Sequence, residues 1–250
     1  MGAKAQYLRV KARSHKQESQ VIVYDADRIQ QPGPELFDPA HWERRAAVAG
    51  RAVGRGRTLL LETEFGPAVL RQYLRGGWPA RISRDHYLFT GYARSRPLAE
   101  FRMLSELCEM GLPVPAPLAA LCARQGLWYR GCLLMERILQ AAPLADLIAE
   151  RADDGSLWRC CGAVIRRFHA AGVVHADLNA RNILVGQGQA VHLVDFDRAR
   201  VAEGDAAAFR ANLARLRRSL EKLWPEPLRA RLDGCWSQLL GGYGQAGETA

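Results

Sequence analysis

Two short stretches of the chain place proton-accepting and metal-binding side chains between apolar residues. The first runs from residue 175 to 185 and contains Asp177 and Asn182, and the second covers residues 194–197 and contains Asp195. Carboxylate and amide oxygens are ligands that suit Mg²⁺, and such polar groups need partners when apolar neighbours bury them. A proton-accepting carboxylate beside a magnesium site is suited to phosphoryl transfer. We therefore expect the chemistry of a phosphotransferase.

The three side chains have separate expected roles. Asp177 would accept the proton of an attacking hydroxyl group, whereas Asn182 and Asp195 would hold the Mg²⁺ that neutralises a triphosphate. Residues 183–185 and 191–194 are typical of a β-hairpin that would carry Asn182 and Asp195 to neighbouring ends. The order H-x-D-x-x-x-x-N, followed by an aspartate after a strand, is that of the protein-kinase fold. The alternative is a structural turn network in the first stretch and a simple strand end in the second.

A glycine-rich segment, residues 50–57, precedes two apolar runs that are predicted to be strands. Gly54 and Gly56 would let backbone N–H groups approach the phosphates of ATP, and neighbouring arginines add positive charge. The spacing is not the usual G-x-G-x-x-G. A plain hairpin turn is therefore the alternative for this segment.

The second of these strands ends at Arg71, where a kinase fold places the lysine that holds the α- and β-phosphates. No lysine occurs between Lys16 and Lys222. A guanidinium group binds phosphate or carboxylate through two hydrogen bonds, so Arg71 is predicted to take this role. A helix predicted to begin at Ser95 carries Glu100, and we expect an ion pair between Arg71 and Glu100. A surface salt bridge is the alternative for this glutamate.

The order of these elements predicts the fold class. Strands and turns fill most of the chain up to Met135, and helices are expected at residues 156–170, after Asp205 and after Pro227. The prediction is an α+β, bilobal protein-kinase-like fold with a small antiparallel-sheet N-lobe and a reduced helical C-lobe. Met135 would lie where the adenine ring is held between the lobes. The expected segments are a basic tail at 1–20, an N-lobe at 21–136, a C-lobe at 137–240 and a loose tail at 241–250.

Composition sets limits on the class of protein. The chain has 250 residues and is 48% hydrophobic, which suffices for one or two globular domains. No apolar run is long enough to span a bilayer and no signal peptide is recognisable, so we expect a cytoplasmic location. Six cysteines without a C-x-x-C pair indicate reduced thiols. The net charge of +9 favours an anionic partner, and no nucleic-acid-binding motif is present in the sequence.

Arginine and aromatic residues alternate between the Arg71 strand and the Glu100 helix. Arg75, Arg81 and Arg84 are examples, with Trp78 and Tyr87 among them. Such a mixture suits an anionic glycolipid or a membrane surface. An ordinary solvated face is the alternative.

From about residue 40 to 240 the sequence resembles the 3-deoxy-D-manno-octulosonic acid (Kdo) kinases of Gram-negative bacteria, relatives of the lipopolysaccharide core heptose kinases. Several of the motifs are more specific than those of kinases in general. The resemblance rests on residues 54–56, 69–77, 85–89, 96–101, 111–115, 175–184 and 194–197.

The resemblance implies ATP-dependent phosphorylation of the 4-hydroxyl of Kdo on a lipid A precursor, by a peripheral protein at the cytoplasmic face of the inner membrane. It also implies that Asp177 is catalytic and that Asn182 and Asp195 bind the metal. Asp197 replaces the glycine of D-F-G, and either a second metal contact or a backbone hydrogen bond would account for it. The rival functions are a heptose kinase, a protein kinase of the same fold, or a non-catalytic pseudokinase, the last suggested by the missing lysine.

Overall fold

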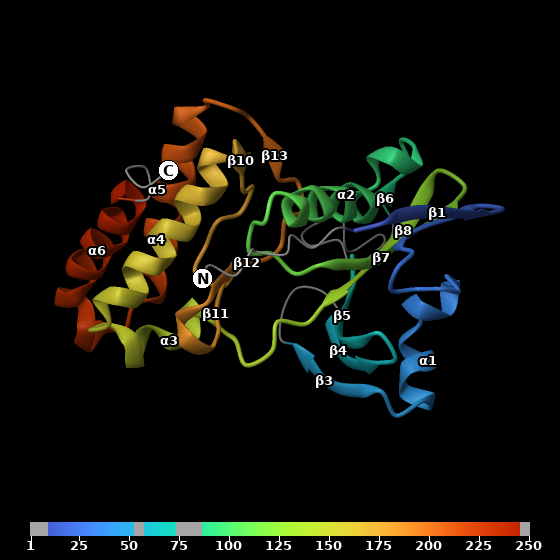
Figure 1. The fold of residues 1–250 in the computed structure, drawn as a ribbon, viewed down its shortest axis with the longest axis horizontal. Helices are drawn as coiled ribbons and strands as arrows, with labels where there is room; N and C mark the ends of the chain where they lie inside the picture. Colours follow the sequence, from blue (N-terminus) through green and yellow to red (C-terminus); the bar gives the residue numbers. More distant parts are fainter. Residues whose placement is uncertain (1–9, 53–57, 74–86, 246–250) are drawn as a thin grey trace, which may run out of the picture. The chain divides into compact units, whose positions relative to one another are not determined.

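The computed structural model describes residues 10–52, 58–73 and 87–245. The chain forms two compact units, coloured along the sequence in Figure 1. The first unit comprises Met1–Gly111 and Pro115–Arg137, and the second comprises Leu112–Val114 and Ile138–Ala250. The first is dominated by an antiparallel sheet and the second by helices, so the predicted α+β class is confirmed.

The described strands of the first unit form one antiparallel sheet in the order β1-β2-β7-β8-β5-β4-β3, with β6 paired to β8. A tight turn at Gly66, whose φ is +103°, joins β4 to β5, the two strands predicted after the glycine-rich segment. The strands are β1 (Ala12–Gln17), β2 (Gln20–Asp25), β3 (Val48–Ala52), β4 (Thr58–Thr63), β5 (Gly66–Gln72), β6 (Tyr87–Leu88), β7 (Pro117–Gln125) and β8 (Trp128–Glu136).

The prediction that residues 1–20 form a basic tail is wrong for the segment of β1. Residues 12–17 pair with β2, and all six are exposed. The exposed charges of Arg13 and Lys16 suit an edge strand, because charge discourages pairing with another chain. These same charges made the segment look like solvated tail in the sequence.

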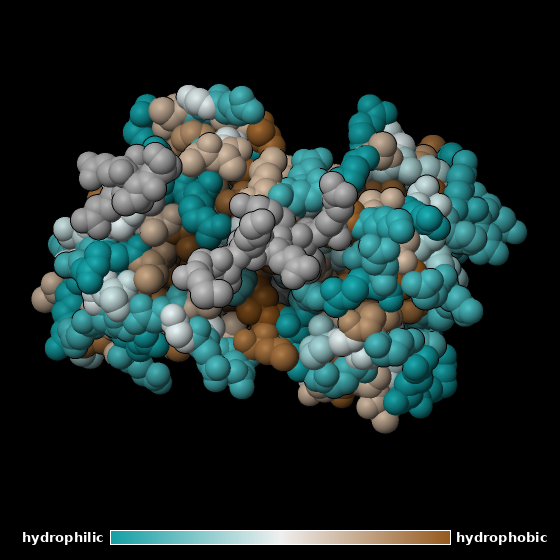
Figure 2. All heavy atoms as spheres, viewed as in Figure 1, coloured by the Kyte–Doolittle hydropathy of each residue, from teal (hydrophilic) through white to brown (hydrophobic). Residues whose placement is uncertain are grey.

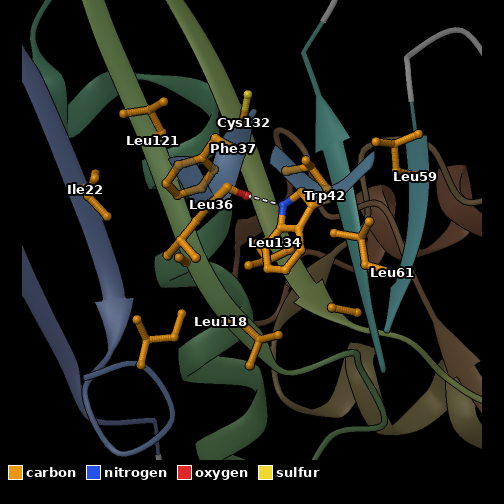
Figure 3. Packing of buried hydrophobic residues seen from close by; sticks show 14 residues of the cluster. Ile22, Leu36, Phe37, Trp42, Leu59, Leu61, Leu118, Leu121, Cys132 and Leu134 are labelled. Carbon is orange, nitrogen blue, oxygen red and sulfur yellow. Dashed lines mark hydrogen bonds between the residues drawn. The ribbon is translucent and has the colours of Figure 1, made fainter. Parts of the chain in front are cut away.

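One face of this sheet is covered by a short segment that contains a 3₁₀ turn, η1 (Pro34–Phe37), and helix α1 (Pro39–Arg44). Trp42 is fully buried, and its indole N–H donates to the carbonyl of Leu36 at 2.9 Å (Figure 3). Asp38 caps the helix by accepting from the N–H of Ala40, as its position before Pro39 predicts. The segment thereby closes the core of the first unit.

Helix α2 (Arg96–Glu109) packs on β7 and β8 and presents Glu100 to the sheet. It begins after Ser95, as predicted, and is followed by Gly111 at φ +68°. A 3₁₀ turn, η3 (Tyr92–Arg94), leads into it. Glu100 shares the buried face of this helix with Leu104 and Leu107, so the packing of these leucines fixes the position of the carboxylate.

Helices make up most of the second unit, with short strands between them. Strands β9, β11 and β12 form one sheet, and β10 pairs with β13. The helices are α3 (Leu144–Arg151), α4 (Gly155–Ala170), α5 (Ala206–Leu223) and α6 (Leu232–Gln245), with 3₁₀ turns η4 (Gln187–Gln189) and η5 (Glu226–Arg231). The strands are β9 (Ala142–Pro143), β10 (Val173–Val174), β11 (Ile183–Val185), β12 (Val191–Leu193) and β13 (Arg200–Val201).

The prediction that residues 241–250 form a loose tail is wrong up to Gln245, because α6 continues to that residue. Its backbone packs closely on α4. A Cβ atom added to Gly162 would lie 1.9 Å from the carbonyl oxygen of Leu239, and one added to Gly242 would lie 2.0 Å from that of Arg159. Gly162 and Gly242 therefore let the two helices approach each other closely.

Hydrophilic residues cover most of the face shown in Figure 2. Within the described part of the chain, no helix combines the length and the apolar character needed to cross a membrane.

Candidate active site

His175 links the two stretches singled out in the sequence. Its Nδ1 accepts the backbone N–H of Asp177 at 3.1 Å, and its Nε2 lies 2.9 Å from the carbonyl oxygen of Val194. Because Nδ1 accepts, Nε2 must carry the proton and donate to Val194. Burial lowers the pKa of His175, which favours this neutral form. The imidazole thus fixes the loop of Asp177 to the end of β12, where Asp195 follows.

Asp177 and Asn182 are joined through the backbone. The side-chain Nδ2 of Asn182 donates to the carbonyl oxygen of Asp177 at 2.9 Å, and Asn179 donates to both the carbonyl and Oδ2 of Asp177 at 2.9 and 3.1 Å. The amide nitrogen of Asn182 is therefore occupied within the loop. Its oxygen is the end suited to a cation, as a hard metal ligand requires.

The hairpin of β11 and β12 places Asn182 and Asp195 at its neighbouring ends, as the sequence predicted. Ile183 pairs with Leu193, and the N–H of Val194 donates to the carbonyl oxygen of Asn182 at 3.0 Å. Asp195 has a φ of +66°, a conformation that non-glycine residues adopt at a cost and that is common at functional sites.

Phe196, the residue after Asp195, has a buried side chain that holds the backbone in place. It is 1% exposed and stacks on Phe168, with ring centres 5.5 Å apart, and its ring lies 4.9 Å from that of His175. A buried aromatic ring directly after Asp195 fixes the path of the chain there. Asp197, where a glycine was expected, lies in the turn beyond it and is half-buried.

Helix α5 contributes residues that sequence reasoning missed. At spacings of three and four residues it carries Asn212, Arg215 and Ser219, and each contacts the loop that holds Asp177. The contacts are Asn212 with the backbone of His175, Arg215 Nη1 with Asp177 Oδ1 at 2.8 Å, and Ser219 Oγ with the N–H of Ala180 at 3.2 Å. The signal in the sequence was a polar stripe beside the leucines that were assigned to the core.

In the first unit the expected ion pair is present. Arg71 Nη2 lies 2.5 Å from Glu100 Oε2, and the two side chains are 18% and 1% exposed. Tyr73 donates its hydroxyl to the same oxygen, and burial, before any other cause, raises its pKa well above the ordinary value. Glu100 therefore lies in a buried network, and the alternative of a surface salt bridge is excluded.

The ring of Tyr73 is close to two arginines. The guanidinium carbon of Arg71 is 4.7 Å from the centre of the Tyr73 ring, and that of Arg96 is 5.5 Å away. Arg96 also donates to the hydroxyl of Tyr87 at 3.0 Å. Cation–π contacts of this kind hold guanidinium groups in place without neutralising them. Arg71 is thus restrained on two sides, by a carboxylate and by a ring.

Of the other residues predicted to belong to the site, Met135 is described by the structure and the others are not. Met135 is 7% exposed on β8, where it pairs with Val69 and Pro117, two positions before the first unit ends at Arg137. Gly54 and Gly56 lie outside the described residues, as do Arg75, Arg81 and Arg84. The roles assigned to all of these residues stay predictions.

Comparison with known proteins identifies the family of this chain. The chain matches the model of the lipopolysaccharide kinase (Kdo/WaaP) family over residues 39–243. A 3-deoxy-D-manno-octulosonic acid kinase of Xanthomonas euvesicatoria pv. vesicatoria (strain 85-10) is 46% identical over 89% of this chain and 88% of its own. The one of Stenotrophomonas maltophilia (strain R551-3) is 47% identical over 81% and 80%. A solved structure of WaaP in complex with acyl carrier protein aligns with a TM-score of 0.48 and 16% identity, over 87% of this chain and 96% of that chain.

Proposed function

This chain belongs to the lipopolysaccharide kinase (Kdo/WaaP) family, and from that premise we propose that it phosphorylates the Kdo sugar of a lipopolysaccharide precursor at the expense of ATP. Its activity is that of a Kdo kinase, a phosphotransferase of lipopolysaccharide core biosynthesis. The fold is kinase-like, with a sheet-rich first unit and a helical second unit. The observation that carries the assignment to chemistry is the hydrogen-bonded group formed by Asp177, Asn182 and the β12 end that precedes Asp195.

In the proposed reaction, Asp177 orients the acceptor hydroxyl and accepts its proton as the γ-phosphoryl group is transferred in line. Its side chain is 58% exposed, which is consistent with access for an acceptor. Arg71 contacts the nucleotide phosphates, and Glu100 keeps its guanidinium in place. The proposal also gives Gly54 and Gly56 the role of phosphate contacts and Met135 that of a contact to adenine.

Mg²⁺ is proposed as the metal, held by Asn182 and Asp195. Both side chains offer the oxygen ligands that this cation requires, and the amide of Asn182 is already oriented by its bond to the Asp177 carbonyl. When bound, the ion neutralises charge on the triphosphate. A site with all three groups argues against the pseudokinase alternative, because a binding module has no need of them together.

The acceptor is proposed to be a Kdo-lipid A precursor phosphorylated at the 4-hydroxyl of Kdo, at the cytoplasmic face of the inner membrane. The motif resemblance and the net charge of +9 support an anionic glycolipid at an anionic surface. Nucleic acid is not proposed as a partner, because the sequence contains no nucleic-acid-binding motif.

Transfer of labelled γ-phosphate from ATP to a panel of acceptors tests the function. The wild-type protein is expected to label a Kdo-lipid acceptor in the presence of Mg²⁺, and neither a heptose acceptor nor a generic protein. Labelling of the heptose acceptor or of the generic protein instead would support the corresponding rival kinase, and ATP binding without transfer to any acceptor would support a non-catalytic binding module.

The role of Asp177 is tested in the same assay. We expect Asp177→Ala to bind ATP normally and to lose about 10²- to 10⁴-fold in kcat, the usual contribution of a proton-accepting group. Equilibrium binding of a fluorescent ATP analogue supplies the control. Turnover close to that of the wild type would remove Asp177 from this role.

A further inference from the structure

The three α5 residues that contact the catalytic loop differ in burial. Asn212 is 6% exposed and bonds the backbone of His175 in both directions, donating to its carbonyl at 2.8 Å and accepting from its N–H at 3.0 Å. The hydroxyl oxygen of Ser219 accepts a hydrogen bond from the N–H of Ala180 at 3.2 Å. These two residues fasten the loop to the helix by backbone contacts on both sides of Asp177.

Arg215 lies between them in the sequence, and its contact is of another kind. Its side chain is 50% exposed and that of Asp177 is 58% exposed, although their atoms are 2.8 Å apart. Exposed ion pairs contribute little to stability, because water competes for both charges and long side chains lose freedom. With the loop already held by Asn212 and Ser219, the ion pair of Arg215 is not what positions the backbone.

The pair also occupies an oxygen that the reaction needs. Oδ1 of Asp177 is bound by Arg215, and Oδ2 by the side chain of Asn179. To accept a proton from a hydroxyl group, one of these oxygens must face the acceptor. The bond to Arg215 is the one that an incoming anion can displace, because it is exposed to solvent and a carboxylate that binds the guanidinium group at two points forms a stronger pair. Asn179, by contrast, also bonds the carbonyl of Asp177 within the same loop.

Arg215 differs in this respect from its neighbours on α5. Arg217 contacts Glu221 at 2.9 Å and Asp233 at 2.5 Å, both in the second unit. Arg210 is exposed and lies five residues before Arg215, on another side of the helix. Arg215 is the α5 arginine for which the structure records a contact with Asp177.

We propose that Arg215 binds the carboxylate of the acceptor sugar and so selects an acidic sugar over a neutral one. This inference rests on the proposed function, in which the acceptor is an octulosonic acid that carries a carboxylate and the reacting hydroxyl on one ring. Binding of the carboxylate draws the guanidinium away from Oδ1 of Asp177. The freed oxygen then faces the hydroxyl of the same sugar.

The test compares two acceptors with matched variants. A Kdo-lipid and its carboxyl methyl ester are phosphorylated by the wild type, by Arg215→Gln and Arg215→Lys, and by the control Arg210→Gln. We expect the wild type and the control to prefer the free acid by about 10- to 100-fold in kcat/KM, the scale of a charge-assisted hydrogen bond. Arg215→Gln should reduce the preference to about threefold or less, mainly through a higher KM for the acid, and Arg215→Lys should restore part of it.

Three outcomes would overturn the inference. One is an equal loss of kcat for both acceptors in Arg215→Gln, which would mean that Arg215 only positions Asp177. The others are an undiminished preference for the acid in that variant and a wild type that does not distinguish acid from ester. The KM for ATP and the thermal unfolding midpoint control for folding, and Arg215→Lys, which keeps the cation, serves if the glutamine variant does not fold. Failure of the proposed function looks different, because the wild type would then phosphorylate neither acceptor.

Discussion

Each of the two units contains a carboxylate with a role in the proposed reaction, and the two carboxylates differ in their exposure to solvent. The side chain of Glu100 in the first unit is 1% exposed and receives Arg71 and Tyr73 on one oxygen. That of Asp177 in the second unit is 58% exposed, and its ion pair with Arg215 faces solvent.

This difference separates structural from chemical roles. Removing one partner of a buried ion pair leaves the other charge without compensation and costs about 3–5 kcal/mol, whereas exposed pairs contribute about 0.2–1 kcal/mol. A carboxylate that must meet a substrate has to stay accessible, and therefore contributes little to folding. One that must hold an arginine still can be buried and become part of the core.

Stability measurements on the two carboxylates give the largest expected contrast. Glu100→Ala should lower the free energy of unfolding by about 3–5 kcal/mol, because Arg71 loses its buried partner. Asp177→Ala is the matched control and should change it by about 0.5 kcal/mol or less. Urea unfolding of both variants provides the values. Equal losses in the two variants would break the proposed division.

Asn212 is expected to combine the two behaviours. Replacing it with Ala leaves the buried N–H and carbonyl of His175 without their side-chain partners, which should cost about 1–3 kcal/mol of stability. Turnover should fall as well, because Asp177 is two residues beyond the released backbone. Arg210→Ala on the same helix is the control. A stable Asn212→Ala protein with full activity would show that α5 does not hold the loop.

Acid should weaken the second unit through a buried imidazole. His169 contacts Tyr243 Oη at 2.9 Å and Asn212 Oδ1 at 3.4 Å, and burial lowers its pKa from 6.5 to about 4. Between these values the unfolded chain binds a proton that the folded protein does not, so stability falls as the pH is lowered from 6.5 towards 4. We expect a loss of about 1–2 kcal/mol from this residue, less than the full pKa difference would give.

Urea unfolding at several pH values between 7 and 4.5 measures this slope. His169→Gln removes the titrating group and should flatten the dependence, even if it lowers stability throughout. An unchanged slope in that variant would show that His169 is not responsible. A flattened slope would show that the neutral form of His169, which contacts Asn212, contributes to the stability of the folded protein.

Local sequence patterns predicted much of the fold. Glycine with positive φ at the β4–β5 turn, Asp38 and Asp205 as helix caps, and the β11–β12 hairpin were all readable from neighbouring residues. The errors came at the two ends of the chain, which were predicted to be tails. Pairing of β1 with β2 and packing of α6 on α4 depend on partners that a local pattern does not reveal.

The candidate site divides in the same way. The sequence by itself determined the order of Asp177, Asn182 and Asp195, because one loop and one hairpin place them and both are encoded by adjacent residues. Only the tertiary structure decided that Arg215 meets Asp177 across 38 positions of sequence, and that Glu100 is buried with Tyr73 as well as Arg71. Such contacts depend on which helix face packs against which loop, and that choice is made by the whole core of a unit rather than by the residues that touch.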